Sequence, residues 1–149
     1  MTDQDFMKIA LKEAQKAFLK DEVPVGAVIV DADGQIVAKA HNQTEHGLDP
    51  TKHAEILCIR KACQKLKTKR LWDCVMYVSL EPCAMCAAAL SFARIKKIVI
   101  GATDEKGGAV VNGVRFFESK TCHFSPEIVC GVMADVSSKM LKDFFLQKR

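Results

Sequence analysis

The sequence predicts a single α/β domain, residues 1–149, with helices on both faces of a central sheet. With 49% hydrophobic and 27% charged residues among 149, the chain has the size and balance of one globular domain with its own core. Some segments repeat apolar residues at helical steps, and others are short apolar runs typical of strands. The two kinds alternate without a linker, repeat or low-complexity stretch, which is the pattern of an α/β domain.

The N-terminal segment is predicted to form a helix followed by a hairpin. Thr2–Asp3 offers N-cap residues before an amphipathic stretch that runs to about Lys20. Val25–Val30 is a continuous apolar run, as expected of a strand covered on both faces. The turn pair Asp33-Gly34 separates it from a second strand over 35–40, so the two strands form a hairpin.

The middle of the chain is predicted to hold a second helix and a βαβ unit. A loop over 41–49 leads to Pro50–Thr51, which are helix-start residues, and this helix ends near the basic cluster 65–70. Val75–Leu80 reads as a strand, Glu81-Pro82 starts a helix that reaches about residue 93, and 95–100 reads as the next strand.

The C-terminal part is predicted to contain a long loop, a short strand and a last helix. Residues 107–126 have weak periodicity, and a loop of that length is uncommon unless it is functional. A short strand over 127–131 precedes an amphipathic helix over 133–145.

Charge and cysteine usage exclude several classes of protein. The formal net charge of +4 permits a polyanionic partner without requiring one. No apolar run approaches the roughly 18 to 20 residues of a membrane helix, and the first five residues are acidic where a signal peptide would be basic. Seven cysteines are an odd number, so reduced thiols or metal ligands are favoured over a disulfide framework. A cytoplasmic protein is expected, with no membrane partner.

Two short motifs, each at a predicted helix start, carry the chemistry. His53-Ala54-Glu55 opens the second helix, and Pro82 precedes Cys83 and Cys86 at the start of the third. The two cysteines lie on one face of a first helical turn, where unpaired backbone N–H groups favour thiolates. Two thiolates and one imidazole are the ligands zinc prefers, and the absence of a second C-x-x-C leaves a fourth position for water.

Glu55 is predicted to be the general acid and base. It lies two positions from His53, about 200° around an ideal helix, so the two side chains cannot share a lateral face of the helix. The metal must therefore lie near the helix end, where Glu55 faces the bound water instead of ligating the ion.

Two other interpretations of the motifs remain. A structural zinc site needs a fourth ligand, for which Cys58 or His41 could be proposed. C-x-x-C at a helix start is also the arrangement of thiol oxidoreductases, although that interpretation leaves His53 and Glu55 without a role.

The motif pair, H-A-E followed by P-C-x-x-C, resembles the signature of the zinc-dependent cytidine deaminase superfamily. Over nearly the whole chain the sequence resembles one branch of that superfamily, the bacterial tRNA-specific adenosine deaminases. The resemblance is carried by Val23–Val28, Asn42, Asp49–Thr51, Leu80–Cys86, Gly101-Ala102, Asp104, Lys106–Ala109 and Asp143–Phe145. The segment 111–126 departs from the family pattern, so substrate contacts from this loop are not carried over.

This resemblance implies a three-layer α/β/α fold with a central mixed five-stranded sheet, and a homodimer with sites near the subunit interface. It implies hydrolytic deamination of the wobble adenosine in a tRNA anticodon, that of an arginine tRNA, to inosine. One zinc ion per subunit is expected on His53, Cys83 and Cys86, with Glu55 moving the protons. Expected substrate contacts are Asn42, Ala54, Asp104, Lys106, Phe144 and Phe145.

The alternative function with the same zinc chemistry is that of a deaminase of a free purine base or nucleoside, for example guanine. The C-terminal segment favours RNA, because Lys142, Lys148 and Arg149 accompany Phe144 and Phe145. Cations neutralise phosphates, and aromatic rings stack on unpaired bases. On spacing alone, however, both phenylalanines fit the core side of an amphipathic helix and its edge.

Overall fold

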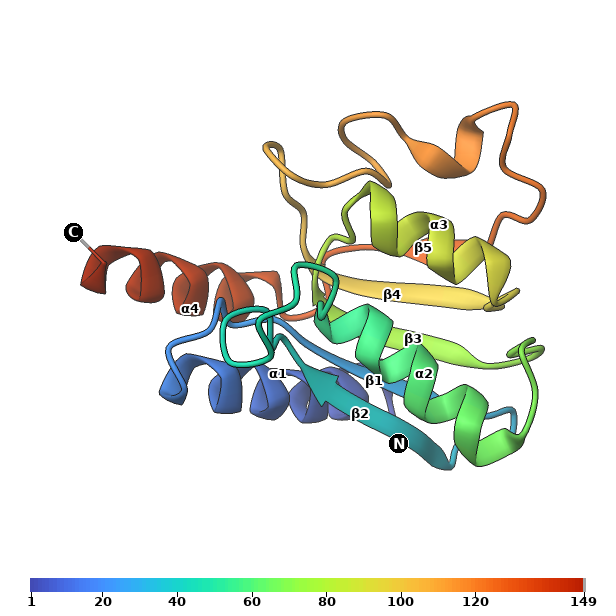
Figure 1. The fold of residues 1–149 in the computed structure, drawn as a ribbon, viewed down its shortest axis with the longest axis horizontal. Coiled ribbons are helices and arrows are strands. Elements are labelled where there is room, and N and C mark those ends of the chain that lie inside the picture. The colour runs from blue at the N-terminus through green and yellow to red at the C-terminus, as the bar shows by residue number, and fades with distance from the viewer. Residues whose placement is uncertain (149) are drawn as a thin grey trace.

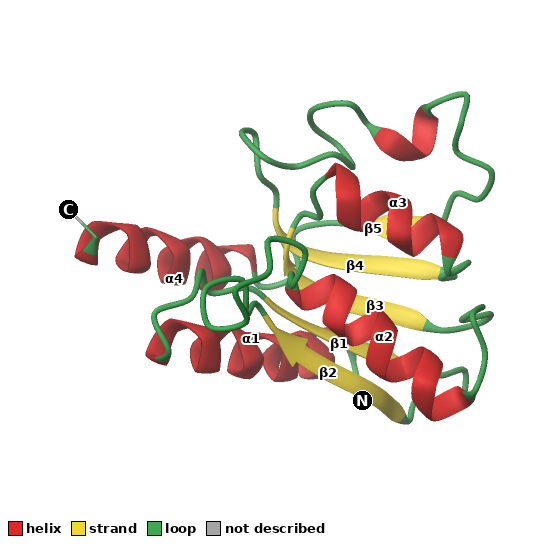
Figure 2. Cartoon of the chain, viewed as in Figure 1, coloured by secondary structure: helices red, strands yellow, loops and turns green. Residues whose placement is uncertain are grey.

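A five-stranded mixed sheet forms the centre of the computed structural model, which describes residues 1–148 (Figures 1 and 2). The predicted three-layer fold is confirmed, with four helices packed on the sheet. The elements follow in the order α1 (Asp3–Leu19), β1 (Gly26–Val30), β2 (Ile36–His41), α2 (Ala54–Leu66), β3 (Val75–Leu80), α3 (Ala84–Phe92), β4 (Lys97–Ala102), the 3₁₀ turn η1 (Phe116–Glu118), β5 (Glu127–Val129) and α4 (Ala134–Gln147).

The strand order β2-β1-β3-β4-β5 determines which ends of the strands lie side by side. Strand β1 is antiparallel to both β2 and β3, whereas β3, β4 and β5 run parallel. The start of β1 at Gly26 therefore lies beside the ends of β2 and β3, at His41 and Leu80. The loops that leave β2, β3 and β4 all begin at this end of the sheet, which we call the carboxyl end of β3.

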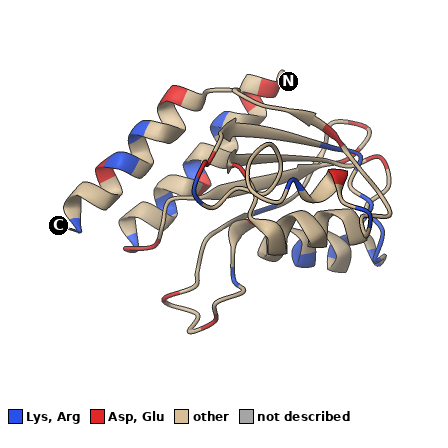
Figure 3. Ribbon diagram, turned by 90° about the horizontal axis from the view of Figure 1, so that it is seen from above, with Lys and Arg blue, Asp and Glu red and all other residues tan. Residues whose placement is uncertain are grey.

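Helices cover both faces of the sheet (Figure 3). On one face α2 and α3 pack over a core that includes Ile29, Met76 and Ile98. On the other face α1 and, over β4, α4 cover a second core that includes Val28 and Tyr77. Every residue of β1 is buried because both of its faces are covered, which explains its unbroken apolar sequence.

Helix α1 begins as predicted and packs very closely on β1. Thr2 and Asp5 form a reciprocal capping box at its start. A Cβ on Gly26 would lie 2.0 Å from the backbone oxygen of Ala10, so only glycine permits this approach. None of the helices in residues 1–148 combines the length and apolar character needed to cross a membrane.

Helices α2 and α3 begin two to four residues later than predicted. The Asp49 carboxylate accepts hydrogen bonds from the backbone N–H and hydroxyl of Thr51, which holds 49–51 in a turn instead of a helix. Glu81 continues the sheet pattern, since its N–H donates to the Ala102 oxygen. As a result His53 and Cys83 have extended backbone conformations and are the N-cap residues of the two helices.

The long loop between β4 and β5 is ordered by its own contacts. It contains η1, and Phe117 packs against the core beside α3. Ser91 of α3 donates a hydrogen bond to the Phe124 oxygen at 2.8 Å, and Ser125 donates to the Phe117 oxygen at 2.8 Å. The loop thus packs along one side of α3, and its first residues, 103–112, turn toward the carboxyl end of β3.

Candidate active site

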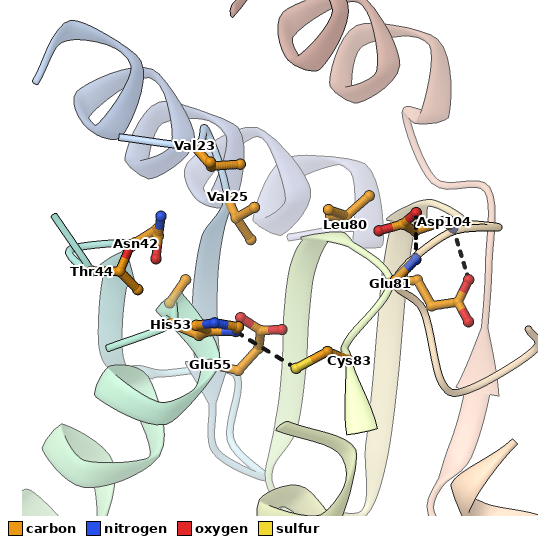
Figure 4. Close-up of a pocket in the computed structure, with 12 residues that line it drawn as sticks. Val23, Val25, Asn42, Thr44, His53, Glu55, Leu80, Glu81, Cys83 and Asp104 are labelled. Atoms are coloured by element: carbon orange, nitrogen blue, oxygen red, sulfur yellow. Dashed lines mark hydrogen bonds between the residues drawn. The ribbon is translucent and has the colours of Figure 1, made fainter. Parts of the chain in front are cut away.

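The two helix starts bring His53, Cys83 and Cys86 together at the carboxyl end of β3. His53 and Cys83 are N-caps, and Cys86 lies in the first turn of α3. The His53 Nδ1 atom is 3.6 Å from the Cys83 Sγ (Figure 4). It is 3.5 Å from the Cys86 Sγ. In residues 1–148 this is the one group of three such side chains placed to hold a metal ion.

The donor geometry fits a tetrahedral zinc ion. With Zn–N bonds of about 2.0–2.1 Å and Zn–S bonds of about 2.3 Å, tetrahedral angles place the nitrogen and each sulfur about 3.6 Å apart. The distances in this structure match that separation without any rearrangement. The set supplies three protein ligands, which is the number found in catalytic zinc sites with one open position.

Neither candidate for a fourth ligand joins this group. Cys58 is buried in the core, where its thiol donates to the Ala38 oxygen and burial raises its pKa. The His41 ring is hydrogen-bonded through Nδ1 to the Asn42 oxygen. A closed structural site is therefore not formed, and the contacts of His53 with both sulfurs disfavour a simple dithiol redox pair.

Hydrogen bonds among the three side chains favour a negatively charged thiolate, which is the form that binds a metal cation. A hydrogen bond from Cys86, together with one from His53, lowers the pKa of Cys83 to about 4. The same contact with Cys83 and burial raise the pKa of Cys86. A thiolate is thus available at a helix N-terminus, where the peptide dipoles stabilise it.

Glu55 lies in the first turn of α2, next to His53 and outside the group of ligating atoms (Figure 4). Only 4% of it is exposed, and burial raises its pKa to about 7. A carboxyl group with a pKa near neutrality can both accept and donate a proton. The arrangement therefore places an acid/base group beside a three-ligand metal site.

These groups line a cavity of about 290 Å³, at the lower end of the size range of small-ligand sites. Most of its exposed surface is apolar, although polar residues contribute to its walls. The lining residues are Val23, Val25, Asn42, Thr44, His53, Ala54, Glu55, Leu80, Glu81, Cys83, Asp104 and Gly107.

Three of the six predicted substrate contacts lie in this cavity. Asn42 and Ala54 are buried in its wall, and Asp104 lies on the opposite side (Figure 4). Lys106 is exposed beside Gly107, at the rim, and its backbone N–H donates to the Asp104 carboxylate.

The prediction for Phe144 is wrong. Only 4% of this side chain is exposed, and its ring packs edge-on against Phe18 at 5.7 Å, so it belongs to the core of the α1–α4 layer. Phe145 is half exposed and lines a separate hollow with Leu141, Lys142 and Leu146. The periodicity of the helix had indicated this alternative, a core residue and its edge.

Sequence reasoning missed two buried glutamates that hold the walls of the cavity. Glu22 accepts hydrogen bonds from the backbone N–H groups of Glu45 and His46, and so holds the loop after β2. Glu81 accepts five hydrogen bonds from the loop after β4. For Glu81 the available signal was an acidic residue directly after a buried strand, where an unpaired charge is costly.

Comparisons with known proteins agree with this geometry. Residues 1–102 match the family model described as the cytidine and deoxycytidylate deaminase zinc-binding region. A tRNA-specific adenosine deaminase of Agrobacterium fabrum is 51% identical over 144 residues, which cover 97% of this chain and 94% of the relative.

Two solved structures are also similar. One, from a study of A-to-I editing by tRNA:A34 deaminases, has a TM-score of 0.90 and 50% identity, and the match covers 92% of this chain and 99% of that one. A guanine deaminase from Bacillus subtilis has a TM-score of 0.66 and 41% identity over 69% of this chain and 66% of its own. The chain therefore belongs to the cytidine and deoxycytidylate deaminase zinc-binding family and, within it, to the tRNA-specific adenosine deaminases.

Proposed function

We propose that this protein converts the wobble adenosine of a tRNA anticodon to inosine by zinc-dependent hydrolysis. The observation that carries the proposal is the meeting of His53, Cys83 and Cys86 with Glu55 in a cavity sized for one base. The extent of similarity to tRNA-specific enzymes supports RNA as the substrate, since it spans nearly all of both chains.

One zinc ion per chain would be held by His53 Nδ1, Cys83 Sγ and Cys86 Sγ. When bound, zinc lowers the pKa of a coordinated water and so supplies a nucleophile at neutral pH. The net charge of two thiolates, an imidazole and Zn²⁺ is zero, so the acidifying effect is weaker than in an all-histidine site. A protein base is therefore needed to take the proton.

Glu55 would carry the protons of the reaction. Its carboxylate takes a proton from the attacking water and delivers it to the purine ring nitrogen next to C6. The C–O bond forms at C6. The carboxylate then takes the second proton from the new C6 hydroxyl and delivers it to the amino group. The C–N bond breaks, ammonia leaves and the C6 carbonyl of inosine forms. The burial of Glu55 supports this role, because it keeps the two protonation states close in free energy.

The rest of the cavity would bind the flipped base. No protein group in residues 1–148 hydrogen-bonds the Asn42 side-chain amide, so it is free to contact the base. Ala54 and the apolar walls would pack on the ring. Asp104 and Lys106 at the far side, with the exposed ring of Phe145, would contact neighbouring nucleotides.

A homodimer is also proposed, and the outer face of α3 supports it. The nine residues of this helix include no charged side chain. Ala84, Met85, Ala88 and Phe92 are exposed or half-buried on its surface, and 64% of Phe92 is accessible. An exposed apolar stripe of this kind is typical of an interface. A tRNA substrate and reduced thiols both favour the cytoplasm as the location.

Zinc retention tests the ligand set. Purified wild-type protein is expected to contain about one zinc per chain, and Cys83→Ala to lose most of it because two ligands bind zinc far more weakly than three. Metal analysis after dialysis measures this, with Cys130→Ala, an exposed cysteine that does not line the cavity, as the control. Full zinc in Cys83→Ala, or a metal-free redox-active pair, would contradict the proposal.

Replacing Glu55 separates catalysis from metal binding. Glu55→Gln is expected to keep zinc and fold while activity falls by about 100- to 10,000-fold, the contribution of a positioned acid/base group. Single-turnover rates and zinc content are measured together, and Glu45→Gln, an exposed glutamate on the neighbouring loop, is the control. If zinc is lost along with activity, Glu55 is a ligand and the proposed mechanism is wrong.

The substrate is tested by comparing the activity of the protein on RNA with its activity on small molecules. An arginine-tRNA anticodon stem-loop is expected to yield inosine, more slowly at higher salt because phosphate contacts are screened. Free guanine, adenosine and cytidine should release no comparable ammonia. A stem-loop with guanosine at the wobble position controls for other editing sites. Ammonia from guanine without inosine in the RNA would favour the purine-base alternative.

Measuring the oligomeric state tests whether the α3 surface forms a dimer interface. Sedimentation at micromolar concentration is expected to give twice the chain mass of 16.5 kDa. Phe92→Lys should shift the particle toward the monomer, since a charge would be buried at the interface. Leu19→Lys, an equally exposed apolar position at the end of α1, should not. A wild-type monomer would rule out the dimer.

A further inference from the structure

The Glu81 carboxylate is the centre of a hydrogen-bond network beside the cavity. It is 3% exposed and accepts five hydrogen bonds. Its Oε1 atom accepts from the Asp104 N–H at 2.9 Å and the Asn112 Nδ2 at 2.8 Å. Its Oε2 atom accepts from the N–H groups of Val110, Val111 and Asn112 at 3.0, 3.0 and 3.1 Å.

Backbone amides, not a cation, balance this buried charge. No lysine or arginine in residues 1–148 forms a salt bridge with Glu81. The five donors replace the water that a carboxylate loses when it is buried. A neutral glutamine would place an NH₂ group against donors, so the network needs the carboxylate.

The network connects the segment that carries Cys83 with the cavity wall formed by Asp104 and Gly107. On one side, Glu81 directly follows Leu80 and is two residues from the ligand Cys83. On the other side, it holds Asp104, whose carboxylate in turn accepts from the Gly107 N–H at 3.1 Å (Figure 4). Asp104 and Gly107 form the wall opposite Asn42.

The loop fits tightly around the carboxylate. A Cβ on Gly108 would lie 2.5 Å from the Glu81 Oε2 atom, so the absence of a side chain there lets the loop close on Glu81. The ligand segment has separate backbone support, since Glu81 N–H donates to the Ala102 oxygen and Ala109 N–H donates to the Pro82 oxygen. Loss of the carboxylate would therefore free the loop that carries Asp104 and Gly107, while Cys83 keeps its backbone support.

We propose that Glu81 is a positioning residue for the substrate, because its carboxylate fixes the wall of Asp104 and Gly107 relative to the metal site. Glu81 does not touch the reacting atoms in this role. It acts through the loop 104–112, which determines where the base and its neighbouring nucleotide lie. This inference rests on the proposed function, because the substrate it positions is the RNA.

The test compares Glu81→Gln with Glu13→Gln, in which a second buried glutamate is neutralised on α1, away from the cavity. Zinc content, kcat and KM for the anticodon stem-loop, and hydrogen exchange over residues 104–112 are measured for each. Asn112→Ala, which removes one of the five donors and keeps the charge, is the milder variant should Glu81→Gln fold poorly.

Glu81→Gln is expected to keep zinc, to raise KM by about 10- to 100-fold with a smaller change in kcat, and to speed exchange over 104–112. Asn112→Ala should shift KM and exchange in the same direction by less, and Glu13→Gln should shift neither. The proposal is overturned if zinc is lost, if KM and exchange match those of Glu13→Gln, or if kcat alone falls. If wild-type protein does not act on the stem-loop, the proposed function fails, and the exchange data alone decide whether Glu81 holds the wall.

Discussion

The site depends on the meeting of two helix N-termini at one end of the sheet. Because β1 runs antiparallel between β2 and β3, the loops after β2 and β3 leave the sheet at the same end. Each loop leads into a helix on the same face, and the N-caps of those helices are His53 and Cys83. His53 and Cys83, the proposed ligands, are separated by 30 residues in sequence, and their side chains thus come within 3.6 Å of each other.

Buried carboxylates then hold the irregular segments that complete the cavity. Glu22 binds the loop after β2 and Glu81 binds the loop after β4, both mainly through backbone N–H groups. Such a carboxylate is costly to bury alone, but several amide donors offset the lost hydration. The same interaction satisfies loop amides that would otherwise lack partners. The cavity walls are therefore fixed by hydrogen bonds to buried side chains.

Local patterns in the sequence predicted the strands, the helices and the metal ligands, because each depends on residues a few positions apart. The helix starts were misplaced, since the Asp49 side chain and the Glu81 backbone N–H form hydrogen bonds that keep the following residues out of the helices. The roles of Glu22 and Glu81 depend on amides 23 to 31 residues away, which no local pattern reveals. Helix periodicity placed Phe144 on the inward face of its helix, but it could not show that the Phe144 ring packs against Phe18.

The later start of α2 also changes how His53 and Glu55 share the site. On an ideal helix their side chains would diverge by about 200°. His53 has extended backbone with φ −72° and ψ 153°, so its ring turns toward the two sulfurs, and Glu55 within the first turn lines the cavity. Two positions that are two residues apart can therefore place the proposed metal ligand and the proposed proton carrier in the same space. A three-residue motif suffices for both proposed roles because the helix begins between them.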